Sequence, residues 1–138
     1  MIKTKRLTQT ATIPTRGSEQ AAGLDLYADV NFVVKAGTHA IIPTGVAVAI
    51  PDGYCGQVWP RSGVSVRYGV DVLAGVIDSD YTGEIKVVLQ AGVHDFEISQ
   101  GDRIAQLLIV PVSMLDCVEV DSLDDTERGA CGFGSTGI

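Results

Sequence analysis

Residues 70–91 read VDVLAGVIDSDYTGEIKVVLQA, and this stretch indicates the fold class more clearly than any other. In its second half, over residues 85–89, apolar residues alternate with Lys86, which is typical of a strand with one buried face. A turn rich in Asp, over residues 78–83, connects this strand to an apolar run over residues 72–77. The stretch therefore predicts a β-hairpin.

Short extended runs separated by turns continue on both sides of this hairpin. Residues 30–54 contain two runs broken at Ala36-Gly37 and at Pro43, and they end in a Pro51-Asp52-Gly53 turn. Residues 103–112 form another apolar strand, which Pro111 ends as an edge or bulge position. With 16 glycines in 138 residues, the chain favours many short strands within a single domain.

Only residues 62–69, SGVSVRYG, suggest a helix. Ser62 is the expected N-cap and Gly69 the expected residue after the C-terminus, which leaves about two turns between them. The strands are too short and too many for alternating β-α-β units. The predicted fold class is therefore all-β with one short helix.

Charge and cysteine content exclude several functions. Seventeen acidic and 10 basic residues give a net charge of −7, so the chain lacks the basic stripe of a nucleic-acid-binding protein. Three cysteines without a C-x-x-C pair indicate neither a disulfide framework nor a zinc site. The N-terminus has no apolar segment and no run could span a membrane, so we expect a cytoplasmic protein, in the host cytoplasm if it is viral.

Residues 132–137 form a literal G-x-G-x-x-G, but only Ile138 follows, so no helix can open there as in a dinucleotide-binding fold. Glycines let backbone N–H groups approach a phosphate closely. The tail also offers a cation, an aromatic ring and two hydroxyls, on Arg128, Phe133, Ser135 and Thr136. Either this segment is a lid over a nucleotide triphosphate, or it is a frayed terminus.

Two further segments carry candidate chemistry. Arg61 and Ser62 open the predicted helix, where they either bind phosphate or form a simple capped turn. Asp78 follows two apolar strand residues, so it can orient a water as a general base or simply form the turn, as Asp80 can. Tyr81 offers a flat ring that serves either ligand contact or ordinary packing.

Two polar residues lie within apolar strands. Asp25 stands between Leu24 and Leu26, where alternation makes a solvent-facing side chain the expected arrangement and ligand binding the alternative. Gln106 lies in the strand over residues 103–112, and a buried amide must bond neighbouring backbone or reach a site.

Five glycine-containing polar segments follow one another over nearly the whole chain. In this order they resemble the five motifs of the trimeric dUTPases: AAGLDLYA (21–28), PRSG (60–63), GVIDSDYTGEI (75–85), GDRIAQLLI (101–109) and RGACGFGSTG (128–137). The resemblance implies a jelly-roll-like β-barrel over residues 1–124, a flexible C-terminal lid over residues 125–138, and a homotrimer with active sites shared between subunits.

The resemblance also implies the reaction and the residue roles. The chain would hydrolyse dUTP to dUMP and pyrophosphate by attack of water on the α-phosphorus, which limits uracil in DNA and supplies dUMP for dTMP synthesis. Asp78 would activate the water, Tyr81 would pack on the deoxyribose and Asp25 would hold Mg²⁺ through water. On the phosphates, the resemblance places Arg61, Ser62 and Gln106, with Arg103 supporting that wall, and Gly63 is a further substrate-binding residue. On the uracil edge it places the backbone of Gly75, Val76 and Ile77. In the lid it places Arg128, Phe133, Gly134, Ser135 and Thr136.

Two other functions fit part of this pattern. A dCTP deaminase shares the fold but lacks the GFGSTG lid, and a dUTPase-like signalling module would bind nucleotide without turning it over. The chain departs from the family at Cys131, where a glycine is usual; a positive φ there would cost a cysteine on the order of 1 kcal/mol.

Overall fold

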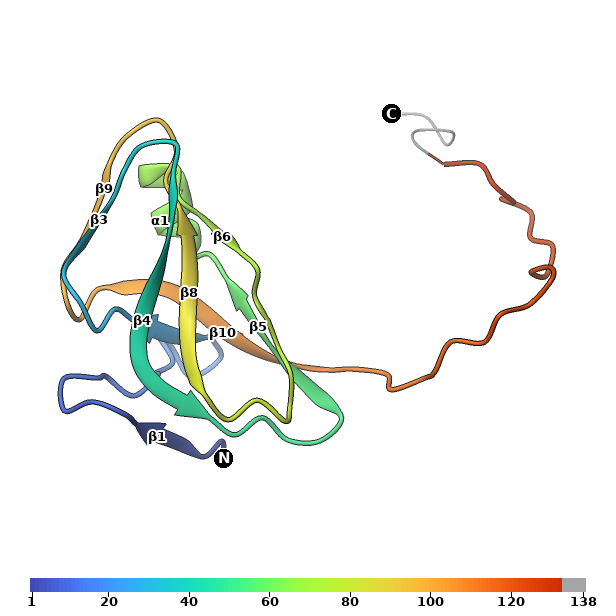
Figure 1. Cartoon of the computed structure of the whole chain (residues 1–138), viewed down its shortest axis with the longest axis horizontal. Helices are drawn as coiled ribbons and strands as arrows, with labels where there is room; N and C mark the ends of the chain where they lie inside the picture. The colour runs from blue at the N-terminus through green and yellow to red at the C-terminus, as the bar shows by residue number, and fades with distance from the viewer. Residues whose placement is uncertain (133–138) are drawn as a thin grey trace.

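The structure is a computed structural model that describes residues 1–132, and Figure 1 shows a β-barrel with a long C-terminal tail. The described chain forms ten strands and one helix. Their bounds are β1 Thr4–Arg6, β2 Leu24–Tyr27, β3 Phe32–Val34, β4 His39–Val48, β5 Tyr54–Trp59, α1 Ser62–Tyr68, β6 Asp71–Leu73, β7 Val76–Ile77, β8 Glu84–Gln90, β9 Phe96–Ile98 and β10 Arg103–Pro111.

Two four-stranded antiparallel sheets enclose the core. Their strand orders are β1-β4-β8-β6 and β2-β10-β5-β7, and β3 and β9 form a separate antiparallel pair. Neighbouring strands are mostly distant in the sequence, as in a jelly roll. The prediction of an all-β, jelly-roll-like fold with one short helix is confirmed.

The core consists of the inward faces of both sheets. On β8 the side chains of Ile85, Val87 and Leu89 are at most 1% exposed, so the predicted alternation of this strand is confirmed. Leu26 of β2 and Leu107 of β10 are equally buried and belong to the same cluster. Burial of such side chains contributes about 1.5–3 kcal/mol each, so this cluster is the main source of stability.

The predicted hairpin over residues 72–89 is only partly correct. Its first arm divides: β6 pairs with β8 as expected, whereas β7 pairs with β5 of the other sheet. The division falls at Ala74, whose φ is +50°, and Gly75, whose carbonyl accepts a hydrogen bond from the Val58 N–H at 2.7 Å. A Cβ on Gly75 would lie 2.7 Å from the Val58 oxygen, so only glycine allows this crossing between sheets.

The predicted break at Pro43 is wrong, because β4 continues through it (Figure 1). The pairing of β4 with β8 shifts register between Pro43 and Ala47, where Gly45 has a φ of +66°. A bulge of this kind tolerates proline and bends the strand. The predicted turn after β4 is present, with Gly53 at a φ of +80° and the Tyr54 N–H donating to the Pro51 carbonyl at 3.1 Å.

Helix α1 and its N-cap begin one residue earlier than predicted. Arg61, not Ser62, is the N-cap, and its carbonyl accepts the N–H groups of Val64 and Ser65 at 3.0 Å. The backbone of Ser62 is already helical, so its side chain caps nothing. Gly69 is left-handed with a φ of 66°, as predicted for the residue that ends the helix.

The turn before β9 is held onto the turn before β4 by one carboxylate. Asp95 accepts hydrogen bonds from the Lys35 ammonium and from the Ala36 N–H, both at 2.8 Å. These two donors hold the pKa of the Asp95 carboxyl below its usual range. The contact joins two exposed turns and lies outside both cavities described below as the candidate site.

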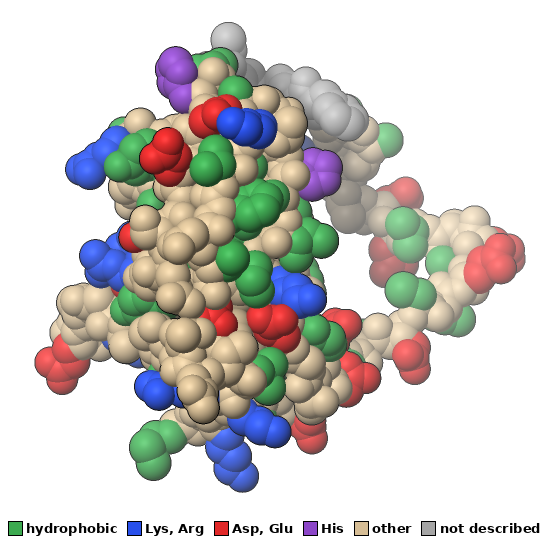
Figure 2. All heavy atoms as spheres, turned by 60° about the vertical axis from the view of Figure 1, so that its left-hand side comes forward, with side chains coloured by type: hydrophobic (Ala, Val, Ile, Leu, Met, Phe, Trp, Pro, Cys, Tyr) green, Lys and Arg blue, Asp and Glu red, His purple; other side chains and the backbone are tan. Residues whose placement is uncertain are grey.

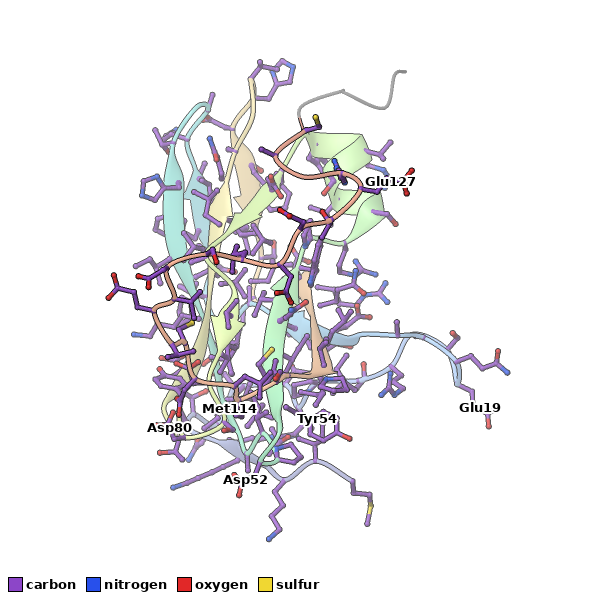
Figure 3. All side chains as sticks on the ribbon, turned by 90° about the vertical axis from the view of Figure 1, so that its right-hand side faces the viewer. Glu19, Asp52, Tyr54, Asp80, Met114 and Glu127 are labelled. Atoms are coloured by element: carbon purple, nitrogen blue, oxygen red, sulfur yellow. The ribbon has the colours of Figure 1, made fainter. Side chains whose placement is uncertain are left out.

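After β10 ends at Pro111, residues 112–132 leave the barrel as an extended tail without helix or strand (Figure 1). Acidic and apolar side chains are both exposed along it (Figure 2), and Figure 3 labels Met114 and Glu127 on it. The strands thus end before the predicted barrel–lid boundary at residue 124, and that boundary stays a prediction. Among residues 1–132, no helix has the length and apolar character needed to cross a membrane.

Candidate active site

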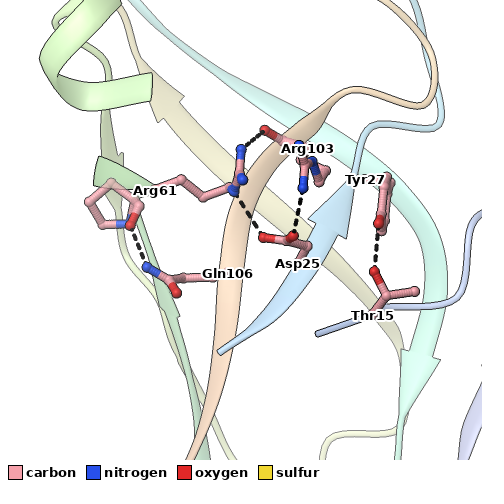
Figure 4. Close-up of polar contacts among 7 residues, drawn as sticks. Thr15, Asp25, Tyr27, Arg61, Arg103 and Gln106 are labelled. Atoms are coloured by element: carbon pink, nitrogen blue, oxygen red, sulfur yellow. Dashed lines mark hydrogen bonds and ion pairs between the residues drawn. The ribbon is translucent and has the colours of Figure 1, made fainter. Parts of the chain in front are cut away.

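Asp25 on β2 is buried, so the expectation that it faces solvent is wrong. The residue is 7% exposed, and its carboxylate accepts hydrogen bonds from Arg61 Nε at 2.8 Å and from Arg103 at 3.4 Å (Figure 4). The N-terminal segment lies along the free edge of β2, where the Asp25 N–H donates to the Thr15 carbonyl at 2.7 Å. Two arginines neutralise the carboxylate, which makes its burial possible.

Gln106 on β10 lies beside Asp25 and bonds neighbouring backbone. It is opposite Asp25 on β2 and Trp59 on β5, and its amide donates to the Pro60 carbonyl at 2.9 Å (Figure 4). A Cβ on Gly23 would lie 2.5 Å from the Gln106 side-chain oxygen. A glycine at position 23 therefore leaves the room that the Gln106 side chain occupies.

The first, second and fourth of the five segments meet at one cavity of about 280 Å³, here named the arginine cavity. Its walls come from the loop before β2, from β2 itself, from the start of α1 and from β10. The lining residues are Gly17, Ser18, Ala21, Gly23, Asp25, Arg61, Ser62, Gly63 and Gln106. Sequence reasoning missed Gly17 and Ser18, although a glycine-serine pair is itself a signal for a tight loop.

The third segment lines a separate cavity of about 260 Å³, here named the hairpin cavity. It opens where the two arms of the predicted hairpin diverge into different sheets. Its lining includes the predicted Gly75, Val76, Ile77, Asp78 and Tyr81, together with Glu84 and Lys86, which sequence reasoning did not place in a site. The divided hairpin thus leaves a cavity between strands of both sheets, with the turn that carries Asp78 and Tyr81 at its side.

Asp78 and Tyr81 lie on the turn that closes the hairpin cavity. Asp78 follows β7 directly and is exposed, and its carbonyl accepts the Tyr81 N–H at 3.2 Å. The Tyr81 hydroxyl donates to the Glu84 carbonyl at 2.8 Å, which folds the ring back over Gly83. Tyr81 remains 44% exposed, so its ring can pack against a ligand.

Among residues 112–132, the described part of the tail, none lines either cavity. Arg128 donates to the Cys131 carbonyl at 2.9 Å, within the tail itself. Phe133, Gly134, Ser135 and Thr136 lie outside the described residues. The two cavities share no lining residue, so the described part of one chain does not join all five segments in one site.

Within residues 1–132, no group of three or more His, Cys, Asp or Glu side chains could hold a metal ion directly. Asp25 is a single carboxylate at the wall of the arginine cavity, and both of its oxygens already accept an arginine. Such a carboxylate suits indirect binding of Mg²⁺, which usually keeps several waters and binds substrate phosphates.

The fold and the two cavities define a small jelly-roll-like β-barrel protein in which one cavity contains an arginine beside a buried carboxylate and the other contains a carboxylate at the end of a strand. The family model described as dUTPase matches residues 9–137, which is nearly the whole chain. The chain belongs to the dUTPase family.

The chain is similar to curated proteins named deoxyuridine 5'-triphosphate nucleotidohydrolase. One from Mus musculus is 50% identical over 133 residues, covering 96% of this chain and 82% of that protein. One from Paramecium bursaria Chlorella virus 1 is 48% identical, covering 97% and 96%. Among solved structures, the dUTPase of Staphylococcus bacteriophage 80alpha with dUPNHPP has a TM-score of 0.93 at 29% identity, covering 100% of this chain and 99% of that one.

Proposed function

We propose that this chain hydrolyses dUTP to dUMP and pyrophosphate, as a dUTP diphosphatase. Its membership of the dUTPase family and its relatives named deoxyuridine 5'-triphosphate nucleotidohydrolase support this function. The observation that carries it is the hairpin cavity, which brings Asp78 and Tyr81 together with residues 75–77. The alternative of a dCTP deaminase finds no support in these relatives.

The hairpin cavity would hold the nucleoside. The backbone of Gly75, Val76 and Ile77 would hydrogen-bond the uracil edge, because β7 pairs with β5 on one side only. The half-exposed Tyr81 ring would pack against the deoxyribose and leave no room for a 2′-hydroxyl. Selection of uracil and of deoxyribose would thus come from one turn and one strand.

The arginine cavity would hold the phosphate chain. Arg61 and Ser62 lie at its wall, and Gly63 has open space around the position of a side chain, so a phosphate can approach its backbone. Gln106 faces the same cavity, and Arg103 supports Asp25 and Arg61 from behind. Placed arginines are needed because the protein itself carries a net charge of −7.

Mg²⁺, when bound to the phosphates, would gather them into one geometry and screen their charge. Asp25 would hold it through water, and a related dUTPase from phage phi11 of S. aureus (26% identical, TM-score 0.83) is described with a structural Mg(II) ion. Asp25 also orients Arg61 through the 2.8 Å ion pair, so it serves the phosphate site with or without the cation.

Asp78 would act as the general base. It is exposed directly after β7, where the strand restricts its position, and it lines the hairpin cavity beside residues 75–77. It would take a proton from a water that attacks the α-phosphorus in line with the leaving pyrophosphate. The product dUMP would supply dTMP synthesis, and removal of dUTP would keep uracil out of DNA.

A homotrimer with shared sites would bring the cavities and the lid together. The separation of the two cavities and the direction of the tail, away from its own barrel, support this assembly (Figure 1). Apolar side chains exposed on the tail, including Met114, Leu115 and Val118 at 79–87%, also support contact with another copy. The tail would then deliver Arg128 and Phe133 to a neighbour's nucleotide.

The direct test is pyrophosphate release from dUTP, measured beside dCTP, dTTP and UTP, with and without Mg²⁺. We expect hydrolysis of dUTP to exceed that of each other nucleotide by at least two orders of magnitude in kcat/KM. Tight binding of a non-hydrolysable dUTP analogue without any turnover of dUTP would instead identify the signalling module. Equal turnover of dUTP and UTP would contradict the role of Tyr81.

A further inference from the structure

Glu84, the first residue of β8, accepts hydrogen bonds on its carboxylate and on its backbone carbonyl, from groups that lie far apart in the chain. Its carboxylate accepts the N–H of Gly45 on β4 at 2.9 Å. Its backbone carbonyl accepts the hydroxyl of Tyr81 at 2.8 Å. One residue therefore connects the exposed ring at the hairpin cavity to the body of the barrel.

The β4 end of this connection is rigid. Gly45 lies at the bulge of β4 with a φ of +66°, and a Cβ there would come within 2.7 Å of Thr8, Ala11 and Asp29. The neighbouring Thr44 is buried and donates its hydroxyl to the Ile85 carbonyl, next to Glu84. A group held by such close packing moves little, so it can serve as an anchor.

The Tyr81 end depends on that anchor. The ring is 44% exposed, so packing restrains it only partly. It crosses directly over Gly83, where a Cβ would lie 2.6 Å from the Tyr81 hydroxyl oxygen. Within the described residues, its hydroxyl has one hydrogen-bond partner, the Glu84 carbonyl. A shift of Glu84 would therefore move the ring.

We propose that Glu84 is a positioning residue that sets the Tyr81 ring against the sugar and thereby contributes to the selection of deoxyribose over ribose; this rests on the proposed function. To reject the one additional oxygen atom of ribose, the side chain that packs on the sugar must stay in a fixed position. When the carboxylate is removed, the Gly45 N–H loses its acceptor, the start of β8 loosens, and the ring gives way to a 2′-hydroxyl.

The test compares Glu84→Ala with Glu84→Gln. The glutamine keeps an oxygen that can accept the Gly45 N–H and loses only the charge that faces Lys86, whose ammonium lies 3.7 Å away. We expect Glu84→Ala to lower the ratio of kcat/KM for dUTP to that for UTP about tenfold, in the range of discrimination by shape alone. We expect Glu84→Gln to keep this ratio within about twofold of the wild type.

Asp95→Ala is the matched control, because it also removes a carboxylate that accepts a backbone N–H and faces a lysine, but on a different turn. It should lower stability without changing the dUTP-to-UTP ratio. Gly83→Ala is the second variant, because its methyl group displaces the Tyr81 ring directly. It should lower the dUTP-to-UTP ratio at least as much as Glu84→Ala. If Glu84→Ala does not fold, Gly83→Ala still tests whether the ring position sets sugar selection.

Three results would overturn the inference. If Glu84→Ala lowers kcat/KM for both nucleotides equally, Glu84 is merely structural. If Gly83→Ala leaves the ratio unchanged, the ring position does not set sugar selection. If the wild-type chain does not hydrolyse dUTP, both the proposed function and this inference fail. If the wild type prefers dUTP to UTP and Glu84→Ala shows the same preference, only this inference fails.

Discussion

Asp25 shows how a single carboxylate can organise a site at the scale of residues. It binds Arg61 at 2.8 Å, Arg61 reaches the Arg103 carbonyl at 3.4 Å, and Arg103 returns to Asp25 at 3.4 Å. The side chain of Arg61 is 27% exposed and that of Arg103 is 50% exposed, so both remain partly in solvent, and Arg61 lines the arginine cavity. The carboxylate thus holds two cations in place without removing them from a ligand.

Asp25→Asn should weaken this cluster. The amide keeps one acceptor but loses the charge, and the partly buried Arg61 is left without a counter-ion. We expect a loss of about 1–3 kcal/mol in the free energy of unfolding, less than for a fully buried pair because both arginines are partly hydrated. Urea unfolding of the variant measures it, with Asp52→Asn in the exposed turn after β4 as the control. A loss equal to that of the control would contradict the structural role.

Asp78→Asn should keep nucleotide binding and lose most turnover. The amide has nearly the same shape but cannot accept the proton of the attacking water, and loss of a general base costs about 10²–10⁴-fold in rate. Steady-state kinetics with dUTP measures kcat, and binding of a non-hydrolysable analogue measures affinity. Asp80→Asn in the same turn is the control, because Asp80 lies at the exposed end of the barrel (Figure 3) and does not line the cavity. Near-normal turnover by Asp78→Asn would exclude its assignment as the base.

At the scale of elements, the tail consists of two parts with different composition. Residues 112–123 expose six large apolar side chains, on Val112, Met114, Leu115, Val118, Val120 and Leu123. Residues 126–137 contain glycines, polar residues and one aromatic ring. The first part has the character of a segment that packs against another surface, and the second has the character of a segment that closes on a ligand.

Truncation after Asp125 should therefore leave a folded oligomer with strongly impaired dUTP hydrolysis. The removed residues include few apolar side chains, so stability should hardly change, but the phosphates and the base would lose their cover and water would enter. Phe133→Ala should show a milder form of the same defect. Kinetics and size-exclusion chromatography of both proteins measure this, and normal hydrolysis by the truncated protein would show that the tail is not a lid.

At the scale of the whole molecule, we expect a homotrimer. Light scattering should give three times the chain mass of 14.5 kDa. Truncation after Pro111 should dissociate it, because it removes the apolar residues 112–123 that truncation after Asp125 retains. Each such side chain contributes about 1.5–3 kcal/mol when buried, which is enough to hold a subunit. A fully active monomer at assay concentration would contradict shared sites.

The sequence by itself determined what depends on neighbouring residues. The alternation of residues 85–89 predicts β8, Gly69 predicts the end of α1, and the five segments in order predict the family. These features are local, because burial of one face and a left-handed glycine leave a pattern within a few residues.

Only the tertiary structure decided what depends on distant partners. Asp25 is buried because its arginines lie 36 and 78 residues away in the chain, and no alternation pattern records them. The hairpin over residues 72–89 divides because Gly75 approaches Val58 on another strand. Strand β4 continues through Pro43 because it pairs with β8 on both sides of the bulge that follows. The hairpin cavity exists because of that division. Strand pairing across the barrel follows from close packing of the whole core. It brings together site residues that the sequence identifies only as separate candidates.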